Sequence, residues 1–429
     1  MPPQPSPPMA PPIPRAPVPS PRAPSGYGRA PATSPRRRTG RRLPGSLLGS
    51  VSAMDRSVLW LYLCTRVGLL VTTYCSAWLF SGTGQSVRPP SLLSRWQQWD
   101  WFFYLHIAQH GYFPAQPSGA AAVSDNRAAF FPGFPGLLRA VHLVVPNWTA
   151  AGLLISFVAG AVAVLALARI AELELLPQHR AEGRVGSRAA FFLLLSPCAL
   201  FLCAGYTESL FLAFALPCWL AARRGNWPLA GLLACGAAGV RVSGLFLAAA
   251  VVVQFALHGQ PHRNWRKLPW LTLPALPALL FTVYLHAHTG DWLAWKHAEE
   301  RGWNRQFTAP WVAWDHTWNA AFGHSQTTPY AFMFQAELAA MAVGAVLVCV
   351  LVRKRRWAEG VYVALNLWAL GTSYWYISVP RATLLWWPLW ILLARWSLRR
   401  SWMKTAYTAV SAPLLTVLTI SFTSGRWSG

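Results

Sequence analysis

The sequence predicts an all-α protein that crosses a membrane many times. Apolar runs of about 20 residues, the length that a helix needs to cross a bilayer, recur along most of the 429-residue chain. The chain is 54% hydrophobic and only 12% charged, whereas soluble domains carry about 25% charged residues. The strand alternation of a membrane barrel is absent. Helices are therefore the expected elements, because they satisfy their own backbone hydrogen bonds in lipid.

The charge is strongly basic, with a net value of +24 from 37 Lys and Arg against 13 Asp and Glu. These basic residues concentrate in an N-terminal tail and in short loops between apolar runs, which is typical of membrane orientation and not of nucleic-acid binding. Residues 1–56 hold 15 of the 35 prolines and no acid before Asp55. We expect a disordered cytoplasmic tail here, then a transmembrane domain over 57–422 and a short tail at 423–429.

The apolar runs predict how many times the chain crosses the membrane and where. Basic clusters lie between the runs, and if all these clusters are cytoplasmic, roughly ten or eleven spans result. Turns are expected near 205–206, 241–243 and 378–381. Two large external loops are expected at 81–128 and 289–330, and the proline-containing segment 129–146 indicates a short broken helix or a re-entrant element. Spans or pairs of short helices are expected at 57–80, 149–171, 189–222, 226–257, 268–288, 331–352, 357–376, 380–396 and 404–422.

The seven cysteines all lie in apolar stretches. They show no CxxC or Cys/His spacing. We therefore expect buried small side chains, and neither a disulfide framework nor a zinc site.

One stretch, RWQQWDWFFYLHIAQHGY at 95–112, is too short and too polar to span, and its aromatics predict a helix at the membrane interface. At helical spacing Asp100, Tyr104, Ile107 and Gly111 share one face. Asp100 is the only acid between Asp55 and Asp125, and a carboxylate among so many rings is a candidate general base. An interfacial anchor, with Asp100 capping the helix start, is the alternative. A neighbouring face carries Trp99, Phe102, Phe103, His106 and His110.

Other polar groups at membrane depth are candidates for the same site. Glu208, within Tyr206-Thr207-Glu208, is a second acid, a metal ligand or a hydrogen-bond acceptor, or else a first-turn residue in a helix that Thr207 caps. Arg241 and Arg381 suit a lipid-linked phosphate, which favours a permanently charged planar donor, or else each pairs with an acid. The expected topology gathers these groups on one external face, and buried ionisable groups in a membrane usually mark a site.

Two further patterns concern aromatic and imidazole side chains. Trp292 and Lys296 belong to a loop in which indoles alternate with charged residues, which fits either stacking on sugar rings or an interfacial aromatic belt. His106 and His110 are four residues apart, a zinc-compatible spacing, but no third ligand follows at useful spacing. Polar packing or hydrogen bonding to substrate is favoured for them.

Six stretches together resemble one family: RWQQWDWFFYLHIAQHGY, AFFPGFPGLL, SPCALFLCAGYTESLFL, WPLAGLLACGAAGVRVSGL, GDWLAWKHAE and SVPRATLLWWPLW. In this order they are similar to the GPI mannosyltransferase II family (PIG-V-like) and its actinobacterial relatives, within the GT-C superfamily. The resemblance covers about residues 57–396. Trp101, where the family often has a small residue, and Val242-Ser243, where the family has Pro-Thr, depart from it.

The resemblance implies a GT-C-like membrane enzyme that transfers mannose from a polyprenyl-phosphate donor, with inversion, on the extracytoplasmic side of the plasma membrane. It implies that Asp100 is catalytic, and places Tyr206 to Glu208 and Arg381 near the donor. Arg381 and Arg241 are the expected phosphate ligands. Other expected substrate-binding residues are Trp99, Tyr104, His106, His110, Tyr112, Tyr206, Glu208, Trp292 and Lys296.

The partners so expected are the lipid-linked sugar donor, membrane lipids and a lipid, glycan or protein acceptor, without nucleic acid. No cofactor is called for, although a divalent cation stays open. Two alternatives remain at this point. A transporter or flippase of lipid-linked sugars would favour repeated halves, which the chain lacks. A non-catalytic scaffold explains the acid and the buried arginines poorly.

Overall fold

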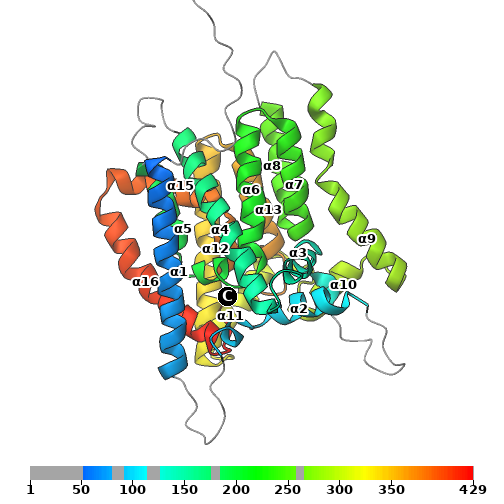
Figure 1. Cartoon of the computed structure of the whole chain (residues 1–429), viewed down its shortest axis with the longest axis horizontal. Helices are drawn as coiled ribbons and strands as arrows, with labels where there is room; N and C mark the ends of the chain where they lie inside the picture. The colour runs from blue at the N-terminus through cyan, green and yellow to red at the C-terminus, as the bar shows by residue number, and fades with distance from the viewer. Residues whose placement is uncertain (1–51, 80–90, 114–125, 175–183, 258–264, 429) are drawn as a thin grey trace, which may run out of the picture. The chain divides into compact units, whose positions relative to one another are not determined.

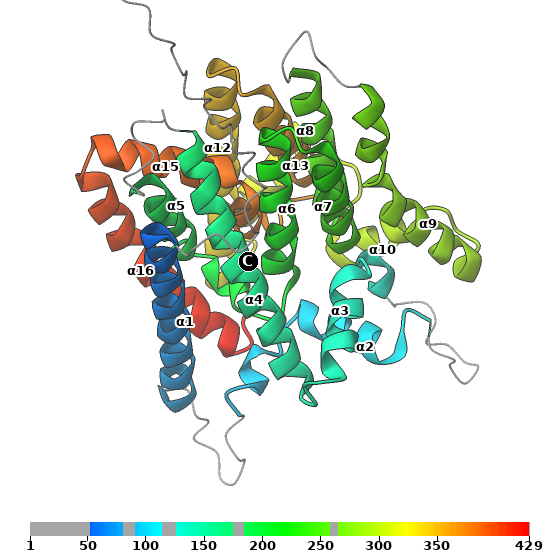
Figure 2. The ribbon, with the colours of Figure 1, turned by 45° about the horizontal axis from the view of Figure 1, so that its top comes forward.

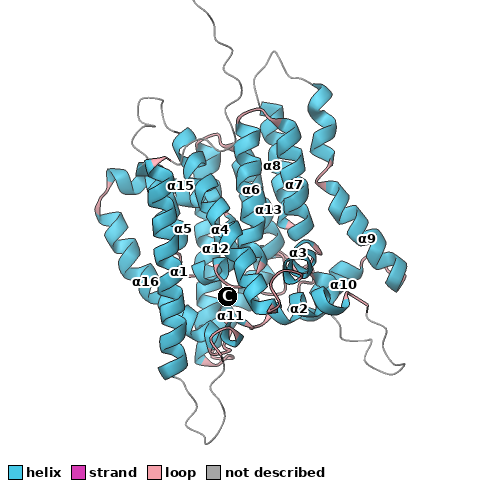
Figure 3. Ribbon diagram, viewed as in Figure 1, coloured by secondary structure: helices cyan, strands magenta, loops and turns pink. Residues whose placement is uncertain are grey.

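The structure is a computed structural model of the chain and describes residues 52–79, 91–113, 126–174, 184–257 and 265–428. The expectation of a disordered tail concerns residues that lie almost wholly outside these ranges. Residues 51–429 form one compact unit. Within the described ranges the chain is helical and contains no strand (Figure 3). The predicted all-α polytopic class is confirmed.

Five stretches of helix are long and apolar enough to cross a membrane. In α1, Val67, Leu70 and Val71 are exposed, as expected of side chains that face lipid in a spanning helix. The expected number of spans, ten or eleven, stays a prediction, because the remaining helices are shorter. The five stretches are α1 (Ala53–Leu79), α4 (Trp148–Leu173), η6 with α9 (Trp265–Thr272 and Ala275–Thr289), α12 (Thr328–Arg353) and α16 (Trp402–Thr423).

Shorter helices pack between the long ones, and most of the expected turns occur where the sequence indicates them. A turn at 203–206 precedes α6, residues 241–242 separate α7 from α8, and Ser378 precedes a four-residue helix, α14 (Val379–Ala382). The shorter helices are α5 (Arg184–Leu194), α6 (Thr207–Arg223), α7 (Trp227–Val240), α8 (Ser243–Leu257), α13 (Trp357–Gly371) and α15 (Trp387–Arg399).

The two ends of the helical bundle differ in chemistry. At one end, which we call the basic end, Arg356 bonds to Glu174 at the end of α4 and to Glu359 at the start of α13. Arg223 at the end of α6 also approaches Glu359, at 3.5 Å. The opposite end, which we call the site end, carries the N-terminus of α4, where Thr149 accepts a hydrogen bond from the Gln97 amide at 2.5 Å.

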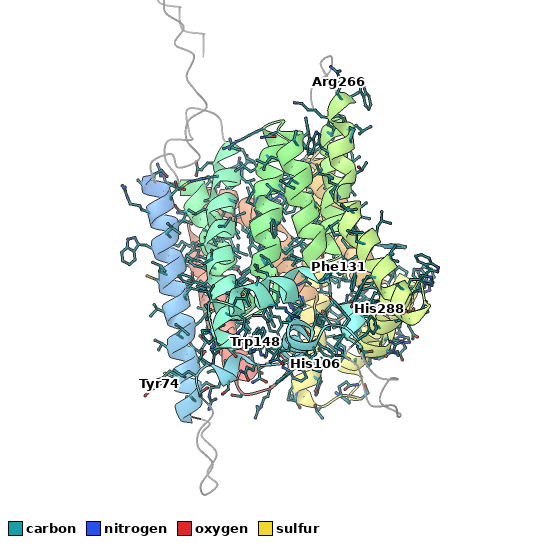
Figure 4. All side chains as sticks on the ribbon, turned by 45° about the vertical axis from the view of Figure 1, so that its right-hand side comes forward. Tyr74, His106, Phe131, Trp148, Arg266 and His288 are labelled. Atoms are coloured by element: carbon teal, nitrogen blue, oxygen red, sulfur yellow. The ribbon has the colours of Figure 1, made fainter. Side chains whose placement is uncertain are left out.

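Four short helices gather at the site end, in the lower part of Figure 1. Figure 2 shows three of them, α2, α3 and α10, on the right of the view. Figure 4 shows His106 and Trp148 at this end and Arg266 at the other. The helix over 133–142 confirms the short broken element expected within 129–146, since ten residues are too few to span. The four helices are α2 (Asp100–His110), α3 (Gly133–His142), α10 (Ala294–Trp303) and α11 (Pro310–Phe322).

The helix expected from residue 95 begins later, at Asp100. Trp99 has a φ of 51°, in the left-handed region that a bulky residue rarely adopts, and this interrupts the helix. The neighbouring Trp101 is fully buried against Gly152 and Gly205, where an added Cβ would lie 2.5 and 2.6 Å from the indole ring. The two glycines therefore make room for Trp101, which locks the start of α2 against the bundle.

Candidate active site

Four charged side chains meet at the site end in one connected cluster. The Arg381 guanidinium donates from Nη1 to Asp100 Oδ2 at 2.7 Å and from Nε to Glu208 Oε1 at 2.6 Å. Arg241 donates to the same oxygen of Glu208 and to Thr207 Oγ1, the latter at 2.8 Å. Two carboxylates are thus balanced by two guanidiniums, the arrangement that makes buried charge tolerable away from water.

Asp100 enters the cluster because α2 begins at this residue. The N-cap residue Trp99 makes no side-chain capping bond, and the Asp100 carboxylate bonds to Arg381. The structure therefore does not show Asp100 as a cap of this helix. Its expected face is confirmed, since Tyr104 and Ile107 are buried beside it. Backbone strain such as that at Trp99 is costly and concentrates at functional sites.

The turn before Arg381 is held by Glu337, a residue that the sequence did not single out. Glu337, buried within α12, accepts hydrogen bonds from the backbone N–H groups of Ser378 and Val379, each at 2.7 Å. A carboxylate at the start of a helix satisfies free N–H groups and complements the helix dipole. Ser378 adopts the left-handed conformation with a φ of 65°. Glu337 therefore fixes the turn that aims Arg381 at the two acids.

The Arg381 guanidinium also lies over two aromatic rings. Its Cζ is 4.7 Å from the centroid of Tyr206 and 4.8 Å from that of Phe201. The Tyr206 hydroxyl donates to the backbone oxygen of Gln98 at 2.6 Å, two residues before Asp100. Rings at this distance attract a cation and restrict its orientation. Tyr206 therefore links the position of Arg381 to the loop that leads into α2.

Glu208 is fully buried at the N-terminal turn of α6, as its place after Thr207 predicts. Thr207 does not cap the helix, because the N-cap is Tyr206 and the Thr207 hydroxyl accepts from Arg241. Arg241 ends α7 in an extended conformation, which turns its side chain from that helix toward α6. Both arginines thus pair with acids, one of the two roles that the sequence left open for them.

Two cavities adjoin the cluster, and Asp100 lines both of them. The large cavity has a volume of about 730 Å³, and the small cavity about 110 Å³. Trp303 and Trp427 also line both cavities. The small cavity receives its charged lining from Asp100, Arg241, Glu299, Arg305 and Arg381.

Two lining residues of the small cavity, Glu299 and Arg305, were missed by the sequence analysis. Arg305 Nε lies 3.3 Å from Glu299 Oε2. Burial raises the pKa of Glu299, and the neighbouring Arg305 only partly offsets this. No local signal separates these residues from the other charges in their loop, so only the folded chain identifies them.

The structure brings together some of the predicted site residues and leaves others apart. Trp99 lines the large cavity and Tyr104 the small one, and Tyr206 contacts Arg381. Seven predicted substrate-binding residues line neither cavity, and their role stays a prediction. Two of them, Tyr206 and Glu208, contact Arg381. The other five are His106, His110, Tyr112, Trp292 and Lys296.

These five have other contacts. The His106 and His110 rings lie 4.9 Å apart, and burial, with Arg127 nearby, lowers the pKa of His106. The Tyr112 hydroxyl donates to the backbone oxygen of Phe130. Trp292 stacks on His286, and Lys296 pairs with Glu300 at 3.4 Å. Across the described ranges, no three or more His, Cys, Asp or Glu side chains are grouped to hold a metal ion.

The fold and the cluster define a class of protein, a polytopic α-helical membrane protein with a buried acid–arginine site at one end. Residues 69–269 match the family model for mannosyltransferase (PIG-V). This match includes Asp100, Glu208 and Arg241 and ends before Arg381. This segment is a little under half of the chain, and together with the relatives described next it supports a PIG-V-like mannosyltransferase.

The relatives are curated proteins named GPI alpha-1,6-mannosyltransferase 2. The rat (Rattus norvegicus) protein is 34% identical over 177 residues, 40% of this chain and 32% of the relative. The mouse (Mus musculus) protein is 34% identical over 198 residues, with shares of 44% and 37%. The human (Homo sapiens) protein is 31% identical over 212 residues, with shares of 46% and 38%. The chain thus matches about a third of the length of these relatives.

Proposed function

We propose that this protein is an integral membrane glycosyltransferase that moves mannose from a polyprenyl-phosphate donor to a lipid, glycan or protein acceptor. The position of Asp100 carries the proposal. This carboxylate borders both cavities and is held by Arg381, so a reactant in either cavity comes within its reach. The family and its relatives supply the sugar, since the names of both specify mannosyl transfer.

In the proposed reaction the acceptor hydroxyl oxygen attacks the anomeric carbon of the donor sugar. The bond from that carbon to the phosphate oxygen breaks, and polyprenyl phosphate leaves with the electron pair. The hydroxyl proton passes to the Asp100 carboxylate, the general base. Arg381 holds one oxygen of that carboxylate, which leaves the other to accept the proton. Attack opposite the leaving group inverts the anomeric centre.

The small cavity is suited to the phosphate. Three guanidiniums line it, and fixed cations near a departing phosphate stabilise the charge that develops there. Arg241 retains 26% side-chain exposure and Arg305 30%, whereas Arg381 retains 7%. Arg241 and Arg305 are therefore the proposed direct phosphate ligands, and Arg381 orients the base while adding to the positive field.

The basic end supports a proposed orientation in the membrane. Arg223 and Arg356 lie there with the arginines at the end of α15, opposite Asp100. Because basic loops remain in the cytoplasm, we propose that Asp100 faces the extracytoplasmic side of the plasma membrane.

The test is sugar transfer by the purified full-length chain, supplied with radiolabelled polyprenyl-phosphate mannose and a membrane lipid extract. D100N should lower the rate by about 100-fold or more, the usual contribution of a general base. The matched control is D315N, because Asp315 is exposed on α11 and its bonding partner among the described residues is Asn319. Normal transfer by a folded, well-expressed D100N protein would remove Asp100 from this role.

A further inference from the structure

A cluster of charged side chains at the basic end has more cations than its acids can balance. Arg356 donates to both carboxylate oxygens of Glu174, with the Nη1–Oε2 distance at 3.0 Å, and to Glu359 Oε1 at 2.7 Å. Arg395 lies 3.5 Å from Glu174, and Arg223 lies 3.5 Å from Glu359. Three guanidiniums therefore share two carboxylates.

Lys354 and Arg399 add two further positive charges to this cluster. Partial burial and three nearby arginines lower the pKa of Lys354, whereas Glu174 acts in the opposite direction and more weakly. The three arginines are Arg395, Arg356 and Arg399. Among the described residues, neither Lys354 nor Arg399 forms an ion pair. The cluster thus has five cations and two acids, a surplus of three positive charges.

The acids of the cluster lie beneath its cations. The side chains of Glu174 and Glu359 are only 6% and 4% exposed, whereas those of Arg395 and Arg223 are 40% and 34% exposed. Lys354 is exposed as well. An anion that approaches from outside therefore meets cations first. Phosphate is the anion that such a group suits, because guanidinium and ammonium donors both make charge-assisted hydrogen bonds to it.

Indole and aliphatic side chains next to the cations indicate a lipid as the source of the phosphate. Trp357 and Trp396 each follow an arginine of the cluster in sequence, and both are exposed. Tryptophan concentrates at the level of lipid headgroups. Val352 and Leu398, within two residues of the cluster, are also exposed. The surface therefore offers cations beside apolar side chains, which match the headgroup and the acyl chains of a phospholipid.

The helix ends that carry these cations are held in place before any ligand binds. Arg188 of α5 donates to the backbone and side-chain oxygens of Ser397 in α15, at 2.8 and 3.0 Å. Arg356 joins the end of α4 to the start of α13. A ligand therefore has little chain to order, which lowers the cost of binding. Cytoplasmic retention of loops requires only their charge, and does not by itself explain why cations from several helices converge.

We infer that the ends of α4, α12, α13 and α15 form a binding site for the headgroup of an anionic phospholipid, with Lys354 and Arg399 as direct phosphate ligands. Basic pockets between helices at the cytoplasmic surface suit such headgroups. The site lies at the end of the bundle opposite Asp100 and takes no part in sugar transfer. Its leaflet rests on the proposed orientation, whereas the binding does not.

The experiment is a lipid titration of the full-length protein in a non-ionic detergent, with bound lipid counted by native mass spectrometry. The probes are dioleoyl phosphatidylglycerol and dioleoyl phosphatidylcholine, which share their acyl chains and differ in net charge. Phosphatidylglycerol should bind saturably and more tightly than phosphatidylcholine. K354Q/R399Q should weaken its binding by about 30-fold and K354Q alone by about 5-fold, which corresponds to about 1 kcal/mol for each lost charge.

The matched control is R266Q/K267Q, which also removes one arginine and one lysine. These residues belong to η6, which continues into α9 on the far side of the bundle from α15 (Figure 1). The control should bind phosphatidylglycerol almost as the wild type does. Equal losses in the two double variants would show attraction to net charge without a site, and would overturn the inference. Equal binding of the two lipids would overturn it too, as would displacement by inorganic phosphate at an equal concentration, which would indicate a site for free anions.

Discussion

Replacing Arg381 by lysine tests whether the geometry of the cluster matters beyond its charge. Arg381 reaches Glu208 and Asp100 with two different nitrogens, at 2.6 and 2.7 Å. Lysine keeps the charge, but its single nitrogen cannot occupy both positions or stack as a plane on Tyr206. One hydrogen bond to a charged group, worth about 1.5–3 kcal/mol, is lost. If that loss falls fully on the transition state, R381K transfers sugar roughly 10- to 150-fold more slowly.

The assay is kcat/KM for transfer from radiolabelled polyprenyl-phosphate mannose, measured beside thermal unfolding. The matched control is R169K at the basic end, where Arg169 is half-exposed and pairs with Asp55 at 3.3 Å. Arg169 reaches Asp55 with one nitrogen from a half-exposed position, and lysine keeps the charge for such a single contact. R169K should therefore leave both measurements almost unchanged. R381K activity within twofold of the wild type, at unchanged stability, would refute the reasoning that Arg381 orients Asp100.

Three further predictions concern the surrounding structure. E337A should lower both transfer rate and thermal stability, because each buried N–H left unsatisfied at α14 costs about 1–3 kcal/mol; wild-type behaviour in both assays would contradict its positioning role. G152A should lower the free energy of unfolding by about 1–3 kcal/mol through overpacking against Trp101, whereas G68A, with nothing within 4 Å, should not. The raised pKa of Glu299 predicts stability that is present below the ordinary glutamate pKa and lost as pH rises through the raised value. E299Q should therefore flatten the dependence of Tm on pH over that window, and an unchanged slope would count against it.

The sequence predicted the parts of the site that depend on local pattern. The length and polarity of 95–112 indicated a short helix at the membrane edge, and its period placed Asp100 with Tyr104 and Ile107. Breaks in the apolar runs located the turns before Glu208 and at Arg241. Hydropathy and helical period are properties of a few residues to a few helical turns. They therefore predict a local element without knowledge of what that segment packs against.

Local sequence patterns could not predict which acid pairs with which arginine in the site. Asp100 and Arg381 are 281 positions apart, and Glu208 and Arg381 are 173 apart. Glu337 looked like one polar residue in an apolar helix, and Arg305 like one charge in a charged loop. Conversely, Trp292 and Lys296 had a suitable pattern but line neither cavity.

The sequence by itself therefore determined the membrane class, the short interfacial helix and the residue types at its edge. Only the tertiary structure decided which acid meets which arginine, and that three arginines gather around one small cavity beside Asp100. The physical reason is that a helix forms from contacts within one turn, whereas a buried charge is tolerated only where another segment supplies its partner.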